Sequence, residues 1–193
     1  MVCSVCKEAG HSKATCPQKP AGPPTLTELR ERVPPEEVMA TLGITEEHVE
    51  KLKVLTKICD DVAKGLKKGR DEKTYQAAIC QDLRAMGVSC TPEVMVPILY
   101  KGLQVATERL DIELHNYLDF IFETKCTMTN IKPEHHWQVI SYMTTQAKRF
   151  GAVVNYNQSP SSVGVEIDII VRNEGRNYLY NLQTGQATIL KDY

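Results

Sequence analysis

The most restrictive feature of this chain is a mainly apolar run, made by Leu118, Phe120, Ile121 and Phe122, that is followed directly by Glu123, Thr124 and Lys125. Such a run is typical of a strand at the centre of a sheet. Side chains alternate along a strand, so Glu123 and Lys125 point to one face and Thr124 to the other. Because a buried charge without a partner is costly, the run predicts a central strand that ends in a polar site.

A second carboxylate, Asp111, lies in an earlier segment that also reads as a strand. An antiparallel neighbour can place Asp111 beside Glu123, and Glu113 on the same face is a further candidate ligand. Two carboxylates and the backbone carbonyl of Thr124 suit Mg²⁺ or Mn²⁺ better than zinc. Lys125 would orient or deprotonate water, or stabilise charge on phosphorus. The set indicates a metal-dependent nuclease centre, although D-x11-E-x-K triples also occur by chance on surface hairpins.

Hydrophobic periodicity predicts the rest of the architecture. A long amphipathic helix is expected from Thr45 to about Lys68, a second from Asp71 to Met86, and a short one after Pro34 that ends at Gly43. The segments that follow predict strands at 93–100, 109–115 and 118–125, a helix at 133–150, and strands at 151–155, 163–172 and 177–182. This order predicts an α/β fold in which an antiparallel meander leads into a central mixed sheet flanked by helices.

Prolines divide the chain into parts. Six of the ten prolines fall between residues 17 and 35, so residues 19–44 are expected to form a semi-rigid linker with short helices. The linker separates a small module at residues 1–18 from a domain at residues 45–160. Residues 161–193 form a C-terminal β extension that would add strands, mediate dimerisation or cover the site.

The N-terminal module has the metal-ligand spacing C-x2-C-x4-H-x4-C, formed by Cys3, Cys6, His11 and Cys16. Three thiolates and one imidazole complete a tetrahedral shell, which predicts a structural Zn²⁺ that provides most of the folding free energy of the module. The pattern resembles the retroviral-type zinc knuckle, which implies contact with nucleic acid. Ser4 and Ser12 stand where knuckles that grip single strands offer bulky apolar side chains, so docking of a protein partner is an alternative.

Four motifs follow one another along the chain: Gly69-x-x-Glu72-x-x-Tyr75, Arg109-Leu-Asp111, Glu123-Thr-Lys125 and His135-x-x-Gln138-x-x-x-Tyr142. Over roughly residues 48–157 they resemble the GxxExxY protein family, a branch of the PD-(D/E)XK nuclease superfamily. The resemblance implies a restriction-endonuclease-like core in which Asp111 and Glu123 bind the metal and Lys125 is catalytic. It also implies that Glu72, on the preceding helix, completes the metal site.

Gln138 and Tyr142 are four residues apart and would share one helix face. By the resemblance they match an element that lies beside the active site and contacts DNA in relatives of RecB-type nucleases. A polar helix face with Tyr142 packed in the core is the alternative. His135 is either a substrate contact or a residue of the first helical turn. We expect Tyr75 to pack rather than react, and His48, His115 and His136 to lie on the surface.

The formal net charge of −1 gives no global basic field, so nucleic-acid contact would need local patches such as the lysine-rich segment 51–70. No apolar run approaches the roughly 20 residues of a membrane span, and residues 1–6 resemble no signal or transit peptide. Seven cysteines, three of them in the knuckle spacing, suit a reducing compartment. We therefore expect a nuclear or cytoplasmic protein without a membrane partner.

The resulting functional hypothesis is a nuclease that hydrolyses phosphodiester bonds of DNA or RNA with metal-activated water. One alternative is a nucleic-acid-binding protein that keeps the fold without turnover. Another is an accessory protein in which the knuckle docks a partner. Besides nucleic acid, a second copy of the chain or a protein partner is a candidate, through the knuckle or the C-terminal extension.

Overall fold

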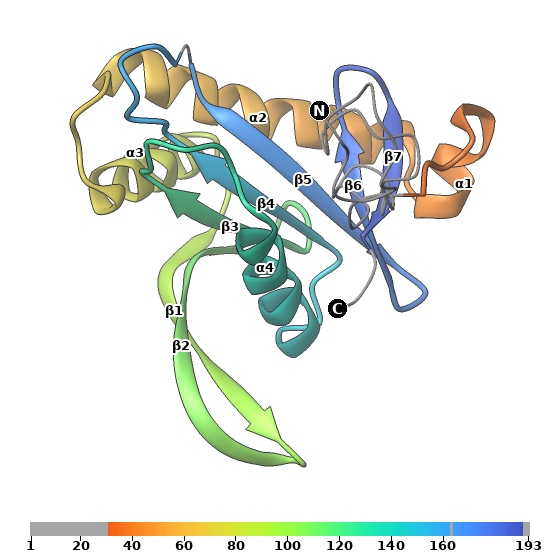
Figure 1. The fold of residues 1–193 in the computed structure, drawn as a ribbon. Helices are drawn as coiled ribbons and strands as arrows, with labels where there is room; N and C mark the ends of the chain where they lie inside the picture. Colours follow the sequence, from red (N-terminus) through yellow and green to blue (C-terminus); the bar gives the residue numbers. More distant parts are fainter. Residues whose placement is uncertain (1–30, 163, 191–193) are drawn as a thin grey trace, which may run out of the picture. The chain divides into compact units, whose positions relative to one another are not determined.

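The structure is a computed structural model that describes residues 31–162 and 164–190. The zinc-ligand spacing at residues 3–16 and residues 19–30 of the expected linker lie outside these residues, and both stay predictions. The compact unit that starts at Arg32 is built on one seven-stranded sheet, whose strands follow sequence order (Figure 1). They are β1 (Cys90–Tyr100), β2 (Leu103–Leu114), β3 (Phe120–Lys125), β4 (Phe150–Asn155), β5 (Glu166–Asn173), β6 (Arg176–Asn181) and β7 (Gln186–Leu190).

The sheet is mixed. β3 and β4 are parallel and are connected by α4 (Pro133–Thr145), whereas the other neighbouring strands of the sheet are antiparallel. Both parallel strands are buried along nearly their whole length, as expected for strands covered on two faces. The predicted α/β class, the central mixed sheet flanked by helices and the antiparallel meander of β1, β2 and β3 are confirmed.

Helices cover both faces of the sheet. Buried residues of α2 (Glu46–Leu66) and α3 (Glu72–Ala85) cluster with one face, and those of α4 cluster with the other (Figure 1). A 3-10 turn at Pro35–Glu37 leads into a short helix, α1 (Val38–Leu42). Within the described residues, the structure contains no helix with the length and apolar character needed to cross a bilayer.

The helix ends follow their capping residues. Thr45 Oγ1 accepts a hydrogen bond from His48 N at 3.3 Å, and Asp71 Oδ1 accepts one from Thr74 N at 2.9 Å, so α2 and α3 begin where predicted. Gly43 ends α1 with φ at +61°, in the left-handed region that glycine adopts without strain. The cap of α3 also sets the position of Glu72 in the first turn of this helix.

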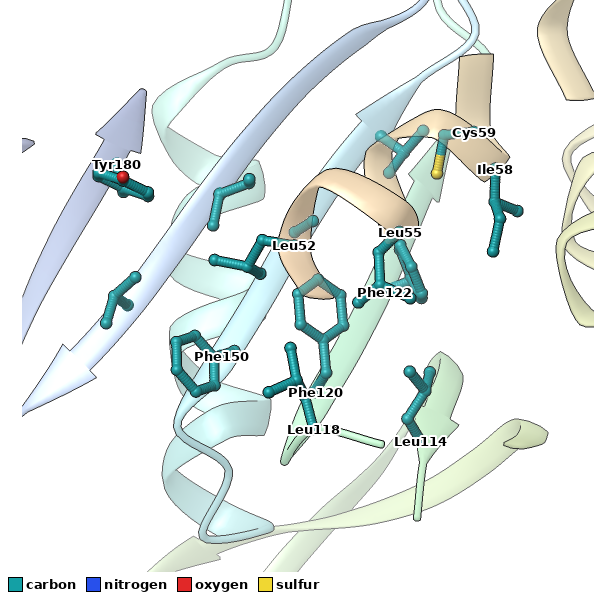
Figure 2. Close-up of a cluster of buried hydrophobic side chains, with 14 of the residues drawn as sticks. Leu52, Leu55, Ile58, Cys59, Leu114, Leu118, Phe120, Phe122, Phe150 and Tyr180 are labelled. Carbon is teal, nitrogen blue, oxygen red and sulfur yellow. The ribbon is translucent and has the colours of Figure 1, made fainter. Parts of the chain in front are cut away.

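The larger part of the core lies between α2 and the sheet (Figure 2). Leu52 and Leu55 of α2 are at most 1% exposed and cluster with Phe120 and Phe122 of β3. Alternation along β3 directs Ile121 to the opposite face, where it joins the cluster around α4. Continued beyond Phe122, the same alternation directs Glu123 and Lys125 toward the face that carries α4.

Three elements differ clearly from the prediction. The strand expected over residues 109–115 is longer and begins at Leu103, as β2. The helix expected to reach Phe150 ends at Thr145, because Ala147 adopts a φ of +52° and Lys148 N donates to Met143 O at 2.8 Å. That bond closes the helix in the way a glycine usually does, but no glycine marks the site. Strand β7 was not predicted. It pairs with β6, and Val33 N donates to Ala187 O at 2.9 Å, so a distant segment supports it.

α4 approaches the sheet closely at Gly151 of β4. A Cβ atom at this position would lie 2.6 Å from Val139 Cγ1 and 2.9 Å from Met143 Sδ. Both distances are shorter than a normal contact, so the absent side chain allows α4 to lie against the sheet. α4 also carries Gln138 and Tyr142, and its depth therefore fixes how near these two side chains come to β3.

We expect Gly151→Ala to destabilise the fold by about 1–3 kcal/mol, because the added methyl group overpacks this contact. Gly65→Ala is the matched control: nothing lies within 4 Å of a Cβ built at Gly65, and alanine favours the helix there. Urea-induced unfolding of both variants measures the difference. Equal stability of the two variants would show that α4 does not depend on a bare position at residue 151.

Candidate active site at a strand fork

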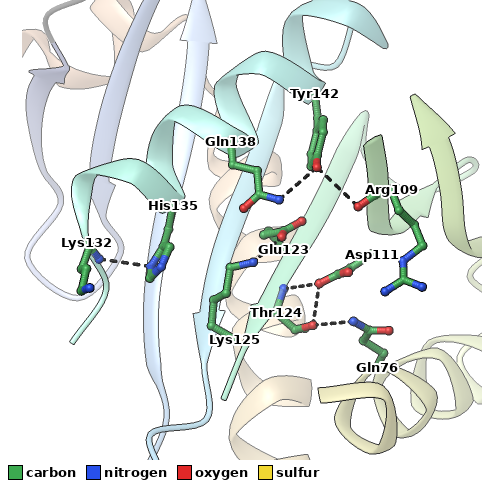
Figure 3. A network of polar contacts seen from close by, with 10 residues as sticks. All are labelled: Gln76, Arg109, Asp111, Glu123, Thr124, Lys125, Lys132, His135, Gln138 and Tyr142. Atoms are coloured by element: carbon green, nitrogen blue, oxygen red, sulfur yellow. Dashed lines mark hydrogen bonds and ion pairs between the residues drawn. The ribbon is translucent and has the colours of Figure 1, made fainter. Parts of the chain in front are cut away.

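β2 and β3 separate on the N-terminal side of Ile112 in β2. Their pairing covers Ile112–Phe122 and Glu113–Ile121, and from Leu110 toward its start β2 forms a two-stranded ribbon with β1. The antiparallel register brings Asp111 alongside Glu123 at this point, which we call the strand fork (Figure 3). The sequence prediction that a neighbouring strand places these two carboxylates together agrees with this geometry.

The Asp111 carboxylate provides the hydrogen-bond acceptor that the backbone of β2 no longer provides once it separates from β3. Thr124 N and Thr124 Oγ1 both donate hydrogen bonds to Asp111 Oδ2, each at 2.7 Å (Figure 3). Thr124 is fully buried, so its N–H would otherwise face no acceptor at the end of the β2–β3 ladder. The strand fork therefore holds the aspartate through the backbone of β3, and the carboxylate direction is fixed by the sheet.

Gln76 extends this arrangement from α3. Its side chain is 4% exposed, and its Nε2 donates to Thr124 Oγ1 at 2.9 Å. The resulting chain runs from Gln76 through the Thr124 hydroxyl to Asp111 (Figure 3). The sequence analysis did not identify Gln76. The available signal was its spacing, because Gln76 lies four residues after Glu72 and shares its helix face.

Glu123 is the most constrained acid of the site. It is 2% exposed, its Oε1 accepts from Lys125 Nζ at 2.5 Å, and its buried Oε2 has no hydrogen-bond partner among the described residues. Burial and then the neighbouring Asp111 raise the pKa of Glu123, which reaches about 8 although Lys125 opposes the shift. A buried carboxyl oxygen without a hydrogen-bond partner is costly, so its place in the fold needs an explanation.

Lys125 and Glu72 face the same acids. Burial alone would lower the pKa of Lys125, but the Glu123 carboxylate outweighs it and the net shift is upward. Lys125 is therefore an ammonium at neutral pH. Glu72 is half-buried, and burial raises its pKa, with Asp111 as the second cause. Glu72 and Asp111 line the same cleft, as expected if α3 supplies a third acid.

Gln138 and Tyr142 approach from α4. Gln138 Nε2 donates to Tyr142 Oη at 3.0 Å, and Tyr142 Oη donates to the Arg109 carbonyl oxygen at 3.4 Å (Figure 3). Burial raises the pKa of Tyr142 to about 12, so its hydroxyl stays protonated. The tyrosine is 1% exposed. The ring therefore packs in the core while its hydroxyl reaches the Arg109 carbonyl beside the fork, and contact of the pair with DNA stays a prediction.

These residues line one cleft of about 540 Å³. The lining contains five carboxylate side chains and two cationic ones: Glu72, Glu108, Asp111, Glu123 and Glu134, with Arg109 and Lys125. The remaining lining residues are Gln138, Ser141 and Tyr142. An excess of carboxylates in one cleft repels a phosphodiester unless cations are added. The structure thus gathers Glu72, Asp111, Glu123, Lys125, Gln138 and Tyr142, although they come from four different elements.

The donor set at the fork fits a hard cation. In the part of the chain that the structure describes, no three His, Cys, Asp or Glu side chains form a group that could hold a metal ion unaided. Mg²⁺ binds through one or two carboxylates and keeps several waters, so Asp111 and Glu123 suffice as protein ligands. The unpaired Oε2 of Glu123 supplies an oxygen that the fold leaves uncompensated. Soft metals are disfavoured because all these donors are oxygens.

Several other candidate residues lie elsewhere. His135 does not line the cleft; its Nδ1 accepts from Lys132 N at 3.2 Å in the first turn of α4. The expectation that His136 lies on the surface is wrong: it is 3% exposed, and its Nε2 lies 2.7 Å from Asp168 Oδ2. Glu113 is not at the fork, because it forms an ion pair with Lys148 at 2.7 Å. Tyr75 packs as predicted, stacked on a second tyrosine with ring centroids 3.9 Å apart.

The part of the lysine-rich segment that lies on α2 is less basic than its sequence suggests. Lys51 pairs with Glu47 at 2.7 Å, Lys53 pairs with Glu50 at 2.7 Å, and Lys57 and Lys64 both pair with Asp61. Each acid lies three or four residues from its lysine on α2, the usual spacing for such pairs. The exposed face of α2 therefore carries nearly balanced charge and offers little net attraction for phosphates.

Comparison with known families agrees with the geometry of the fork. Residues 49–167 match the sequence profile of the PD-(D/E)XK nuclease superfamily, which is more than half of the chain and runs from α2 into β5. No curated protein and no solved structure matches the chain. The matched range includes the fork, the cleft and the helices that line it. The chain belongs to the PD-(D/E)XK nuclease superfamily.

Proposed function

We propose that this protein is a metal-dependent nuclease that hydrolyses phosphodiester bonds of DNA or RNA at the strand fork. The observation that carries the proposal is the convergence of Asp111, Glu123 and Lys125, in which one buried carboxyl oxygen of Glu123 has no partner among the residues that the structure describes. Glu123, Thr124 and Lys125 match the (D/E)-X-K element that the name of the superfamily describes. A retained set of this kind favours turnover over a protein that only binds nucleic acid.

Asp111 and Glu123 would hold Mg²⁺ or Mn²⁺, with the carbonyl of Thr124 as an additional oxygen. When bound, the cation neutralises charge on the phosphate and acidifies water. Two hydrogen bonds from Thr124 already hold the Asp111 carboxylate in place. Asp111 would therefore need little reorganisation to bind the cation. Glu72, at the first turn of α3, would complete the site through a water or directly.

Lys125 would act on the reacting groups. Its ammonium lies 2.5 Å from Glu123 Oε1 and lines the cleft, where it can orient the attacking water and stabilise negative charge on the phosphate. Because the pKa of Lys125 is raised, we assign it electrostatic stabilisation rather than deprotonation of water. A second acid such as Glu72, whose pKa is raised by burial and Asp111, is the better candidate proton acceptor.

Substrate contacts would come from the α4 side of the cleft. Gln138 and Tyr142 are joined by a hydrogen bond and can present polar groups to a sugar or phosphate beside the cation. His135 lies one turn closer to the start of α4, where partial burial and then Lys125 lower its pKa. A neutral His135 would contribute a hydrogen bond rather than charge to the nucleic acid.

Three finer features complete the proposal. The motifs at residues 69–75 and 135–142 favour the GxxExxY branch of the superfamily. Outside the described residues, Cys3, Cys6, His11 and Cys16 would bind a structural Zn²⁺ and form a knuckle that contacts nucleic acid or a protein partner. With residues 1–18 as the knuckle and 19–44 as its linker, residues 45–160 would be the nuclease domain and 161–193 its C-terminal extension. Such a protein would act in the nucleus or the cytoplasm.

The proposal is tested by cleavage of labelled single- and double-stranded DNA and RNA with Mg²⁺ or Mn²⁺. We expect Lys125→Met to lower the cleavage rate by about 100-fold or more, because it removes charge stabilisation at the phosphate. Lys148→Met is the matched control, since Lys148 is equally covered and also pairs with a glutamate, but lies outside the cleft lining. Its rate should stay near that of the wild type.

Two outcomes would contradict the nuclease. Binding of nucleic acid without metal-dependent cutting would leave the inactive nucleic-acid-binding protein as the better interpretation. Cleavage that persists in both Lys125→Met and Asp111→Asn would show that the activity does not come from the strand fork.

Metal-free stability should fall as pH rises. The pKa of Glu123 is about 8 in the folded state, well above the roughly 4.3 of an unfolded glutamate, so the native state holds an extra proton between these values. Its stabilising contribution is complete below the unfolded pKa and is lost as pH rises through the folded pKa. Urea-induced unfolding between about pH 5 and 8.5, without added Mg²⁺ or Mn²⁺, should show this decline in wild type and a flatter profile in Glu123→Gln. An identical slope in both proteins would contradict the assignment to Glu123.

Thr124 allows a test of how Asp111 is held. Thr124→Val keeps the shape but leaves Gln76 Nε2 without its acceptor and removes one donor to Asp111, so we expect a loss of about 1–3 kcal/mol in stability. Mn²⁺ binding should weaken by about tenfold, as for other residues that orient a metal ligand. Thr124→Ser keeps the hydroxyl and should behave nearly as wild type. Valine and serine variants with equal Mn²⁺ affinity would show that the hydroxyl does not position Asp111.

A further inference from the structure

Arg109 lines the cleft but takes no part in the proposed hydrolysis. Among the described residues, two cationic side chains line this cleft, and the other one, Lys125, is paired with Glu123 at 2.5 Å. A nucleic-acid strand brings several phosphates to a protein surface, and the planar guanidinium of arginine is well suited to hold one of them. Arg109 is therefore a candidate contact for a phosphate other than the one that is cleaved.

The main chain and the side chain of Arg109 are both held in place. Its carbonyl oxygen accepts a hydrogen bond from Tyr142 Oη at 3.4 Å, which connects this point of β2 to α4. Its Nη1 lies 3.0 Å from Glu93 Oε1. This ion pair involves one terminal nitrogen, and a guanidinium carries further N–H donors on its other two nitrogens. Figure 3 shows the guanidinium near the Asp111 carboxylate, so those donors lie close to the proposed metal site.

Glu93 joins Arg109 to a second cation. The same Oε1 atom lies 3.1 Å from Lys73 Nζ, and Lys73 follows Glu72 in the first turn of α3. Lys73, Glu93 and Arg109, which we call the Arg109 cluster, carry two positive charges and one negative charge beside an acidic cleft. The cluster therefore offers local attraction for a phosphate where the other cleft residues mostly repel one.

The backbone of Glu93 departs from regular strand geometry. β1 pairs with β2 on both sides of this residue, with Pro92 opposite Ile112 and Val94 opposite Leu110. Glu93 itself has a φ of +55°, in the left-handed region that is unfavourable for a residue with a side chain. Strained positions of this kind are frequent at functional sites. Here the strained residue is the one that holds both cations, which indicates that their position matters.

The spacing of Arg109 and Asp111 fits two neighbouring phosphates. The two residues lie two positions apart on β2, and such residues of a strand are roughly 6–7 Å apart. Adjacent phosphates along one nucleic-acid strand are separated by a similar distance. A phosphate bound at the cation that Asp111 would hold therefore places the next phosphate of the strand within reach of Arg109.

We propose that Arg109 binds the backbone phosphate next to the one that is cleaved, and that Glu93 positions the guanidinium for this contact. Lys73 adds positive charge beside it. The inference rests on the proposed function, because it assigns a contact to the same nucleic-acid substrate. A phosphate contact carries no base information, so this one holds the strand in register over the metal site without selecting a sequence.

Binding of labelled single- and double-stranded DNA and RNA oligonucleotides to the full chain, followed by fluorescence anisotropy at several NaCl concentrations, tests the proposal. Ca²⁺ replaces Mg²⁺ because it binds the same oxygen ligands, and each probe is checked for cleavage on a gel afterwards. We expect Arg109→Met to weaken binding about tenfold and to reduce the slope of log K against log [NaCl] by about 0.7–0.9, the effect of one lost phosphate contact.

Lys53→Met is the matched control for Arg109→Met. Lys53 is also exposed and paired with a glutamate, and its loss changes the net charge equally, but it lies on α2 and outside the cleft lining. Its affinity and its salt slope should stay near those of wild type. Urea-induced unfolding of both variants should also resemble wild type, because exposed ion pairs contribute little to stability.

Two further variants separate position from charge. Arg109→Lys keeps the positive charge but loses the planar donor geometry, so we expect weaker binding with a salt slope near that of wild type. Glu93→Gln removes a negative charge near the substrate, which by electrostatics alone would tighten binding. If Glu93 positions Arg109, the same substitution weakens binding instead, so the sign of the change distinguishes the two roles.

The outcomes that overturn the inference differ from those that overturn the nuclease. Equal affinity and slope in wild type and Arg109→Met would remove the phosphate contact, and tighter binding by Glu93→Gln would remove the positioning role. Neither result affects the proposed function as long as cleavage with Mg²⁺ still depends on Lys125. Wild-type protein that binds none of the probes would overturn both.

Discussion

The site depends on one exchange of hydrogen-bond acceptors at the end of a central strand. Where β2 turns away from β3, the buried N–H of Thr124 loses its neighbour in the sheet, and Asp111 Oδ2 accepts from it instead. Leaving that N–H unsatisfied would cost about 1–3 kcal/mol, so the carboxylate is needed by the fold as well as by the chemistry. The same separation opens the cleft, because β2 no longer lies beside β3 at Glu123 and continues as a two-stranded ribbon with β1.

A second constraint is electrostatic. The fork places Glu123 in a buried position next to Asp111, and Lys125 compensates only one of its two oxygens. The resulting excess of negative charge is unfavourable in the free protein and is relieved by a divalent cation or by a bound proton. Strain of this kind is typical of functional sites, where stability is traded for binding. It also explains why the cleft, acidic by itself, can belong to a protein that acts on an acidic polymer.

The residues of the strand fork can be predicted from the sequence better than the residues that support them. The alternation after Phe122 places Glu123 and Lys125 on one face, and the turn-separated segments around Asp111 make an antiparallel neighbour the simplest arrangement. Gln76 could not be found in the same way, because its role depends on how α3 docks against Thr124, which is a tertiary contact. Its only local signal is the four-residue spacing from Glu72.

Other errors have equally physical causes. The end of α4 was misplaced because Ala147 adopts a left-handed conformation that glycine usually marks. His136 was assigned to the surface although it lies three residues before Val139 and shares its inward face, where Asp168 satisfies the ring. Lysine content overstated the basic character of α2, since the acids that neutralise it are spaced one turn away along the same helix.

The most direct test of the strand fork as a metal site is a Mn²⁺ titration followed by electron paramagnetic resonance, on the full chain kept saturated with zinc. Asp111→Asn and Glu113→Gln form a matched pair, because the two acids lie two residues apart on β2 but Glu113 is paired with Lys148 away from the cleft. We expect one Mn²⁺ ion in wild type and in Glu113→Gln, and about tenfold or weaker affinity in Asp111→Asn. Equal binding in all three proteins, or no binding in wild type, would contradict a metal site at the fork.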